Sequence, residues 1–238
     1  MCEKPLATKS EEADEIFNLA QKHKTPIICG YHLPFSGMGG SARKLLADEA
    51  LGKVTHINFR NAHHAAYGRW FDNPELAWFT NPELSGGGAL LDMGTHAVQF
   101  LRHLGGAVEK VWADIRNLSG IYSDVDDYGL IVLQFKSGVI GRVEAGWIFT
   151  GGHAGLEIIG SKKSVWNSDG LKIGGPGFPA EPVAPIEEKP RQIERLIEVV
   201  KGNISKEDWK ADLEASRDAV KIMEAAYKSA KSGTWVAC

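Results

Sequence analysis

Residues 124–149 constrain the fold most, because their side chains alternate in character over two stretches joined by a turn at 136–138. In the second stretch Val143 lies between Arg142 and Glu144, and the alternation continues on either side of them. Successive residues of a strand point to opposite faces of a sheet. The pattern therefore predicts an antiparallel hairpin with one apolar face, which a core must cover, and one mixed face.

The beginning of the chain has a different character. Residues 8–23 carry apolar side chains at helical spacing, and Thr8 with Glu11 forms a candidate capping box. The apolar run at 27–31 is typical of a strand buried on both faces of a parallel sheet. A helix followed by such a strand is the last part of a βαβ crossover. Because residues 1–7 cannot supply the neighbours that this strand needs, we expect the sequence to be cut from a longer one.

The remaining elements complete the expected fold class. We expect a helix over 41–50 capped by Ser41, a strand over 53–61, and a helix from the glycines at 86–88 to about 104. Further along the chain we expect strands near 153–159 and 163–167, a Gly/Pro-rich loop over 174–185 and two final helices. This order predicts an α+β fold with a mostly antiparallel sheet, and an α/β remnant in front of it.

Charge and composition exclude several classes of function. The formal net charge is -3 and no basic block stands out, so nucleic acid and anionic membranes are poor partners. The three cysteines are odd in number and far apart, which does not suit a disulfide framework and favours a reducing compartment. No apolar run is long enough to cross a bilayer, and the start of the chain lacks the apolar region of a signal peptide. We therefore expect a soluble, cytoplasmic protein.

The stretch from Asp92 to His96 is the most informative for chemistry. On an α-helix, side chains at positions i and i+4 share a face. A carboxylate beside an imidazole can hold its tautomer and raise its basicity, which makes a proton-transfer unit for an alcohol or a ketone. The spacing equally fits a helix cap next to a partly buried histidine, so both interpretations stay open at this stage.

Other candidate sites carry weaker signals. Glu3-Lys4-Pro5 precedes a βα crossover, and ligands bind at the carboxyl ends of parallel strands, although such a triplet also occurs in solvated loops. His63 and His64 would point to opposite faces of a strand, so we expect no metal site there. The aromatic stretch at 67–79 fits either stacking on a sugar ring or covering of the core.

Taken together, these segments resemble the Gfo/Idh/MocA oxidoreductase family, whose members include glucose–fructose oxidoreductase and inositol dehydrogenase. The resemblance covers essentially the whole chain and rests on the order and spacing of five stretches. They are CEKPLA at 2–7, SGGGALLDMGTHAVQFLRHLGG at 85–106, DDYGLIVLQFKSGVIGRVEAGW at 126–147, IIGSKKSVW at 158–166 and AYKSAKSGTWV at 226–236.

The resemblance implies a fold and a division into domains. Members have an N-terminal Rossmann domain that binds NAD or NADP, and a C-terminal α+β domain built on a large open, mostly antiparallel sheet with helices on one face. By this resemblance residues 1–35 are a Rossmann remnant, and residues 36–238 are the substrate-binding and oligomerisation domain. The final helices would pack back on the first part.

The resemblance also implies roles for particular residues. Lys4 would contact the substrate beside the nicotinamide, with Glu3 and Pro5 next to the cofactor. His96 would be the general acid or base, and Asp92 would orient it. Trp78 falls where members contact substrate. The implied reaction moves a hydride to or from a sugar, inositol or related polyol, and the implied site holds no metal.

One departure from the family pattern changes what we expect of this chain. The family's GxGxxG glycine loop is missing, and the glycines at 37–40 lack that spacing. Without that loop there is no helix N-terminus to hold a pyrophosphate, so we expect no tight binding of NAD(P) and no activity by this chain alone. A non-catalytic ligand-binding or scaffold protein, and a sugar-acting lyase or hydrolase that needs no dinucleotide, are the alternatives.

Too little helix is expected to cover both faces of the sheet. Exposed apolar sheet surface usually marks a partner site. We therefore expect a homo-oligomer, a dimer or a tetramer, that forms through the outer face of the sheet.

Overall fold

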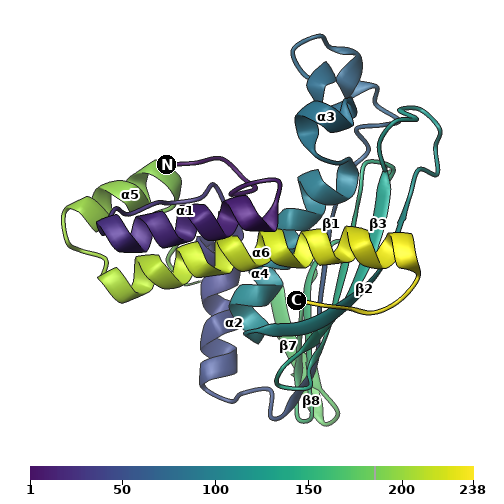
Figure 1. Cartoon of the computed structure of the whole chain (residues 1–238). Coiled ribbons are helices and arrows are strands. Elements are labelled where there is room, and N and C mark those ends of the chain that lie inside the picture. The colour runs from purple at the N-terminus through teal and green to yellow at the C-terminus, as the bar shows by residue number, and fades with distance from the viewer. Residues whose placement is uncertain (185) are drawn as a thin grey trace.

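The structure is a computed structural model that describes residues 1–184 and 186–238. Its centre is a nine-stranded sheet in the order β8-β7-β6-β5-β1-β4-β3-β2-β9 (Figure 1). The strands are β1 Val54–Ala62, β2 Val108–Arg116, β3 Tyr128–Phe135, β4 Ile140–Gly146, β5 Gly155–Gly160, β6 Ser164–Asn167, β7 Leu171–Gly175, β8 Phe178–Pro182 and β9 Val236–Ala237. Within the sheet β1 and β4 run parallel, and the other neighbouring strands run antiparallel. The expected α+β fold with a large, mostly antiparallel sheet is confirmed.

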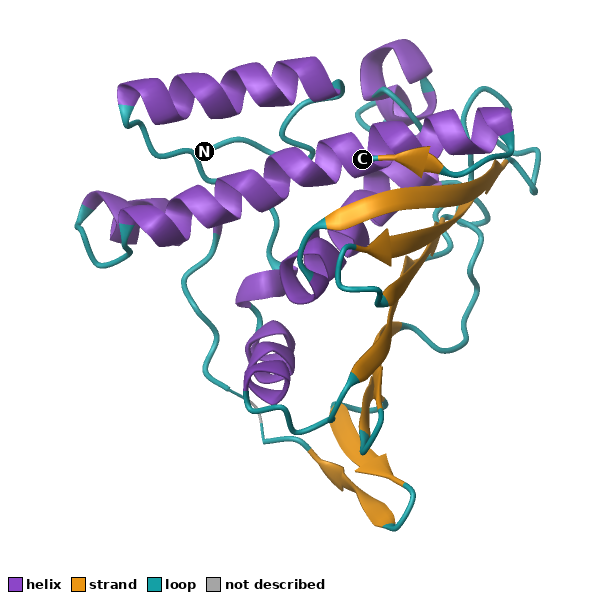
Figure 2. Cartoon of the chain, turned by 60° about the horizontal axis from the view of Figure 1, so that its bottom comes forward, coloured by secondary structure: helices purple, strands orange, loops and turns teal. Residues whose placement is uncertain are grey.

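Apart from α3, the helices gather on one face of this sheet, as Figure 2 shows. The helices are α1 Ser10–His23, α2 Gly37–Ala47, α3 Pro82–Ser85, α4 Thr95–Gly105, α5 Gln192–Val200 and α6 Lys206–Ser232, together with the short turns η1 Leu33–Phe35, η2 Trp70–Asp72, η3 Ala77–Thr80 and η4 Leu90–Gly94. Helix α4 packs on β1 and β4, α6 packs on β2, and α1 packs on α6. One hydrophobic core joins the first 35 residues to the rest of the chain.

The hairpin of β3 and β4 has the alternation that its sequence predicts. Ile131, Leu133 and Phe135 are fully buried under the helices, whereas the side chains between them are only half-buried. On the open face, Arg60 of β1 makes an ion pair with Glu144 of β4 at 2.6 Å between Nη2 and Oε2. The open face is therefore mixed in character rather than apolar.

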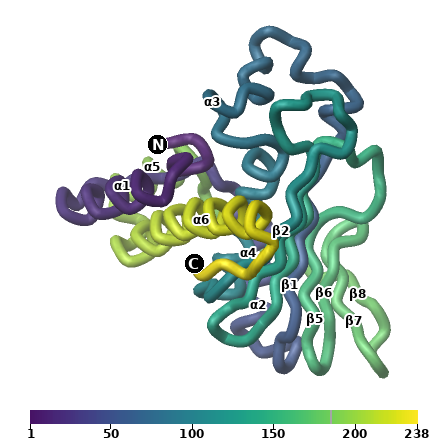
Figure 3. The backbone as a smooth tube through the Cα atoms, turned by 45° about the vertical axis from the view of Figure 1, so that its right-hand side comes forward, coloured from purple at the N-terminus to yellow at the C-terminus, as the bar shows by residue number. Residues whose placement is uncertain are grey.

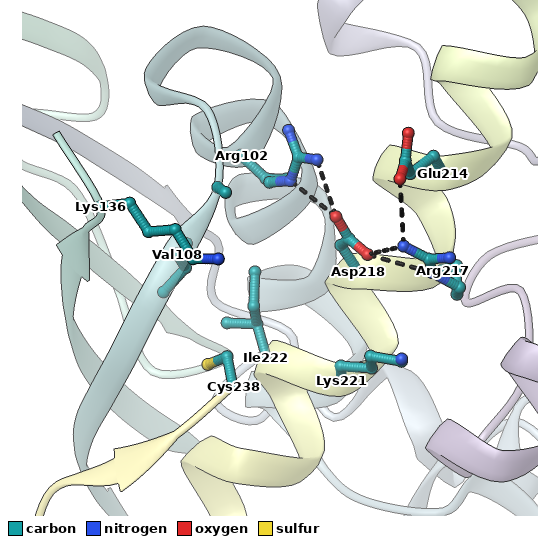
Figure 4. A pocket seen from close by; sticks show the side chains of 10 residues that line it. Arg102, Val108, Lys136, Glu214, Arg217, Asp218, Lys221, Ile222 and Cys238 are labelled. Carbon is teal, nitrogen blue, oxygen red and sulfur yellow. Dashed lines mark hydrogen bonds and ion pairs between the residues drawn. The ribbon is translucent and has the colours of Figure 1, made fainter.

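An ionic network fastens α4 to α6 at the far end of the helical layer. Arg102 of α4 donates from Nε to Oδ2 of Asp218 at 2.8 Å, and Arg217 donates from Nη2 to Oδ1 of the same carboxylate at 2.7 Å. Figure 4 shows this network beside a cavity of about 300 Å³ that Lys136 and Cys238 also line. The Arg102–Asp218 pair bridges the two helices, whereas Arg217 and Asp218 are neighbours on α6.

Two helix starts differ from the prediction. Helix α1 begins after Lys9, and neither Thr8 nor Glu11 caps it; instead the backbone N–H of Ser10 donates to Glu224 of α6 at 2.8 Å. A partner from a distant helix has replaced the local capping box. Helix α2 begins earlier than expected and is capped by Ser36, whose Oγ accepts from the N–H of Gly39 at 3.1 Å, rather than by Ser41.

Two other segments also differ from the prediction. The strand expected at 27–31 is reduced to one parallel bridge between Cys2 and Cys29, because among the described residues only the segment around Cys2 pairs with it. The loop expected over 174–185 contains the end of β7 and all of β8, which form an antiparallel hairpin at the edge of the sheet. Its prolines are compatible with an edge strand, since such a strand leaves one side of its backbone unpaired. Residue 185 lies outside the described residues.

In the described part of the chain, no helix is both long and apolar enough to cross a membrane. Figure 3 shows that the segment around α3 stands apart from the helical layer, at the opposite end of the sheet from β8. This segment, residues 63–88, is called the lobe below.

Candidate functional site

The turn η4 and the start of α4 carry Asp92 and His96. The segment before them is clamped by Asp126, whose carboxylate accepts from the N–H of Gly88 at 3.0 Å and of Leu90 at 2.7 Å. A Cβ on Gly88 would lie 2.1 Å from the Asp126 carbonyl oxygen, so glycine is required there. Tyr227 of α6 donates to the same carboxylate at 2.9 Å. The glycine-rich start thus fixes the turn that holds the candidate site.

Asp92 is bound by Lys4 and by Trp147. The Lys4 Nζ lies 2.5 Å from Oδ1 of Asp92 and 2.9 Å from its carbonyl oxygen. The Trp147 indole Nε1 donates to Oδ2 at 3.0 Å, and the indole itself is fully buried. Both carboxylate oxygens therefore have donors that are not His96. The turn η4 is a π-turn, so the α-helical spacing assumed from the sequence does not apply at Asp92.

His96 has a different environment from that of Asp92. Its ring makes edge contacts with the rings of Tyr31 and His32, at centroid distances of 5.8 Å and 5.3 Å. Its Nδ1 is buried and has no hydrogen-bond partner among the described residues. Burial, followed by the charges of Lys4 and His32, lowers the pKa of His96 to about 3. The imidazole is therefore neutral near pH 7 and able to accept a proton or a hydrogen bond.

Lys4 reaches this place through the parallel bridge near the N-terminus. Cys2 donates its N–H to the carbonyl of Ile28 at 2.9 Å, which sets the two segments side by side. The two bridged segments run in the same direction. Lys4 and His32 follow the bridged residues Cys2 and Cys29, so they lie at the same end of the pair. Tyr31 secures that end to α4, with its hydroxyl 2.7 Å from the Oγ1 of Thr95. Lys4, Asp92 and His96 are thus brought together although 88 residues separate the first two.

Two side chains of this region, Trp147 and His32, were not singled out from the sequence. Trp147 lies in the alternating stretch at 124–149, and His32 directly follows the apolar run at 27–31. His63 was considered only as a metal ligand. It stacks on Trp70 at 4.9 Å, and its Nδ1 accepts from the N–H of Ala65 at 3.2 Å, which leaves the hydrogen on Nε2. Burial lowers the pKa of His63, and the charge of Asp92 acts against this.

Trp78 lies on the lobe and is 45% exposed. It stacks on Phe79 at 3.9 Å, Phe79 stacks on Phe71 at 5.3 Å, and Phe71 packs on Trp147 at 4.4 Å. This row of aromatic rings connects the exposed Trp78 to the indole that holds Asp92. The aromatic stretch therefore covers a small core and also presents exposed rings.

No group of three or more possible metal ligands gathers within residues 1–184 and 186–238. The profile of the GFO/IDH/MocA C-terminal domain matches residues 41–166. The chain belongs to the Gfo/Idh/MocA family. The match includes Asp92, His96 and Trp147, whereas Lys4 lies outside it.

Individual relatives of this Gfo/Idh/MocA chain are distant. Levoglucosan dehydrogenase of Pseudarthrobacter phenanthrenivorans is 25% identical over 167 residues, which are 61% of this chain and 42% of that protein. 2,7-Anhydro-N-acetylneuraminate hydratase of Mediterraneibacter gnavus is 27% identical over 153 residues, 62% of this chain and 39% of that one. The chain thus spans about two fifths of the length of these relatives.

The same fold occurs in an inositol dehydrogenase homolog complexed with NAD+ from Azotobacter vinelandii. Its TM-score is 0.79 at 20% identity, and the match covers 100% of this chain and 71% of that one. A likeness at this identity bears on the fold, and it agrees with the open sheet and helical layer described above.

Proposed function

We propose that this chain supplies the catalytic and substrate-binding part of an NAD(P)-dependent oxidoreductase that acts on a sugar, inositol or related polyol. The observation that carries the proposal is the arrangement of a neutral His96 beside the ion pair of Lys4 and Asp92. An imidazole that lacks a protein partner next to a held ammonium group suits proton transfer to and from an alcohol oxygen. Family membership agrees with this reaction class.

Each group has a distinct task in the proposed step. In the direction of oxidation, His96 accepts the hydroxyl proton of the substrate. The Lys4 ammonium has three N–H donors, and two of them are used on Asp92. The third is available to the same substrate oxygen, where a fixed positive charge stabilises developing alkoxide character. Asp92 is assigned to the positioning of Lys4, rather than to the orientation of His96.

The residues present fit one end of a nicotinamide cofactor. When bound, the cofactor supplies the acceptor or donor of the hydride. Glu3, Lys4 and Pro5 stand at the carboxyl end of a segment in parallel pairing, which is where ligands bind in such sheets. They are therefore the proposed contacts to the nicotinamide side. The 238 residues contain no GxGxxG loop for the phosphates, so the proposed turnover needs a dinucleotide-binding unit in addition to them.

A dehydrogenase assay tests this function directly. We expect a form of the protein that carries such a unit to reduce NAD or NADP with at least one member of a sugar and polyol panel. We expect the 238-residue chain alone to give no micromolar NAD(P) affinity by isothermal titration calorimetry. Micromolar binding by the chain alone would refute the second statement, and a panel without turnover would count against the first.

A lyase or hydratase reaction is a second candidate, because one relative is named as a hydratase of an anhydro sugar. The same groups could remove a proton beside a carbonyl without any net change in the cofactor. Product analysis separates the two candidates. Substrate consumption with no net nicotinamide reduction, in protein loaded with cofactor, favours the second. Sugar binding with no turnover of any kind would favour the remaining alternative, a non-catalytic ligand-binding or scaffold protein.

The open face of the sheet is the proposed self-association surface. Half-buried Trp112 and Val132 lie beside the charged pairs on this face. We expect light scattering at micromolar concentration to give the mass of a dimer or tetramer. Val132→Arg should shift the mass toward the monomer, while Glu15→Arg on exposed α1 should not. A monomeric mass for the unmodified chain would contradict this surface.

A further inference from the structure

A second cavity lies two helical turns along α4 from His96. It has a volume of about 390 Å³, within the range of small-molecule sites, and lies between α2, α4, the start of α6 and the segment before α5. His103 of α4 stands in its wall. Seven residues separate His96 from His103, so the two rings lie on the same face of the helix, about 10 Å apart along its axis. The segment from His32 to Phe35 packs along α4 and connects the candidate site to this cavity.

The cations of this cavity differ in how far they are neutralised. Arg195 is almost fully buried, donates two N–H groups to Asp212 and stacks on Phe35 at 4.3 Å. Arg43 is half-buried, and its Nη1 lies 3.0 Å from Nε2 of His103. Neither Arg43 nor Lys189 makes an ion pair with any residue that the structure describes. Two cations thus retain donors that no carboxylate occupies.

The carboxylates of the same cavity are mostly engaged elsewhere. Asp212 is bound to Arg195, and Glu198 accepts from Lys201 and Asn203. Asp208 accepts from Ser205 at the start of α6 and is the one lining carboxylate without a cationic partner. Two unpaired cations therefore face one unpaired carboxylate, and the balance favours an anion beside Arg43 and Lys189.

His103 also lies among these cations. Burial lowers the pKa of His103 to about 4, and the charges of Arg43, Arg102, Arg195 and Lys189 act in the same direction. Its Nε2 faces Arg43, which can only donate, so this nitrogen accepts and the hydrogen lies on Nδ1. Arg102 and Arg195 are paired with Asp218 and Asp212, whereas Arg43 and Lys189 make no ion pair with a described residue, so a ligand with negative oxygens would offset the charge of Arg43 and Lys189.

We propose that this cavity binds a small oxyanion, a phosphate- or carboxylate-bearing metabolite, through the free donors of Arg43 and Lys189. A guanidinium group can donate two parallel hydrogen bonds to two oxygens of a phosphate or of a carboxylate, and Lys189 adds a second positive charge. The ligand would be distinct from the substrate, since this cavity and His96 lie at different levels of α4. The proposal does not depend on the reaction proposed above.

The test uses the 238-residue chain with inorganic phosphate and with acetate as probes. Isothermal titration gives the affinity, and the His103 ring signals in NMR at constant pH report where the probe binds. We expect saturable binding of at least one probe below about 10 mM. Arg43→Gln should weaken it about tenfold, as loss of a charge-assisted hydrogen bond does. Arg142→Gln, which removes the same charge from the exposed sheet face, should leave it unchanged.

The outcomes separate the two kinds of ligand. Phosphate binding with a response at His103 assigns a phosphate-bearing ligand, and acetate binding alone assigns a carboxylate-bearing one. Lys189→Gln provides a second variant, at an exposed position where the fold does not depend on the side chain. Absence of binding by both probes would overturn the proposal, as would equal affinity in the folded Arg43→Gln and Arg142→Gln variants.

Discussion

Replacing His96 by Asn is expected to lower kcat for sugar oxidation by about 10²- to 10⁴-fold in a form of the protein that binds NAD(P). The substitution removes the proposed proton acceptor, while the ion pair of Lys4 with Asp92 remains in place. KM should change much less, because the hydroxyl groups away from the reacting carbon keep their contacts. Steady-state kinetics on the first active substrate of the panel gives both constants.

The pH profile distinguishes proton transfer from a structural role of His96. Because burial and Lys4 hold the pKa of His96 at about 3, the acid limb of kcat/KM for oxidation should lie well below the ordinary histidine value of about 6.5. Lys4→Gln removes a positive charge and should move this limb upward. The exposed His23→Asn serves as the control and should leave kcat and the limb unchanged. A limb near 6.5 in the unmodified enzyme would contradict the assignment.

The second large effect is a loss of stability in mild acid. His96 and His103 are neutral in the folded chain, with pKa values lowered to about 3 and about 4 by burial and nearby cations. In the unfolded chain both titrate near 6.5, so between about pH 4 and 6.5 the unfolded state binds more protons. The contribution of the neutral rings is therefore complete above about pH 6.5 and is lost as the pH falls.

The slope of the free energy of unfolding against pH follows from how many more protons the unfolded chain binds than the folded one. Each proton contributes up to about 1.4 kcal/mol per pH unit, so the free energy of unfolding should fall by about 2 kcal/mol from pH 6 to pH 5. Urea unfolding at pH 7, 6 and 5 measures it. The carboxylate of Glu224, whose pKa is lowered to about 2, contributes only below its ordinary value near 4.5 and so lies outside this range.

A variant tests the origin of that slope. His103→Phe removes one of the two rings whose pKa is lowered most and should reduce the slope by up to about half, whatever it does to the absolute stability. The exposed His23→Asn should not change the slope. A free energy of unfolding that stays constant within about 0.5 kcal/mol between pH 7 and 5 would show that neither ring is held neutral.

The sheet could be predicted because its signal is local. Alternation at 124–149 fixes which side chains of β3 and β4 face the core, and the hairpin turn sets their register. The hairpin of β7 and β8 was missed for the opposite reason. Its glycines and prolines resemble a loop, and only pairing with β6 and the position at the sheet edge make it a strand pair.

The site could be predicted only in part. The motif around Asp92 and His96 is local, so the sequence alone makes both residues candidates. What each of them contacts is not local, because Lys4 and Trp147 come from segments 88 and 55 residues away in the chain. For the same reason the cap of α1 was missed, since Glu224 approaches from the last helix. Contacts at such separations leave no periodic trace in one sequence.

The parallel pairing of β1 with β4 has a consequence for which segments of such a protein can vary in length. Two parallel neighbours cannot be joined by a tight turn, so the chain must leave the sheet after β1 and return before β4. The lobe, the turn with Asp92 and the helix with His96 all lie in the connection between β1 and β4. Insertions or deletions in the lobe would therefore change the surroundings of the proposed substrate site, while the strand register and the positions of Asp92 and His96 stay fixed. Changes in the lobe are thus separable from the pairing that stabilises the sheet.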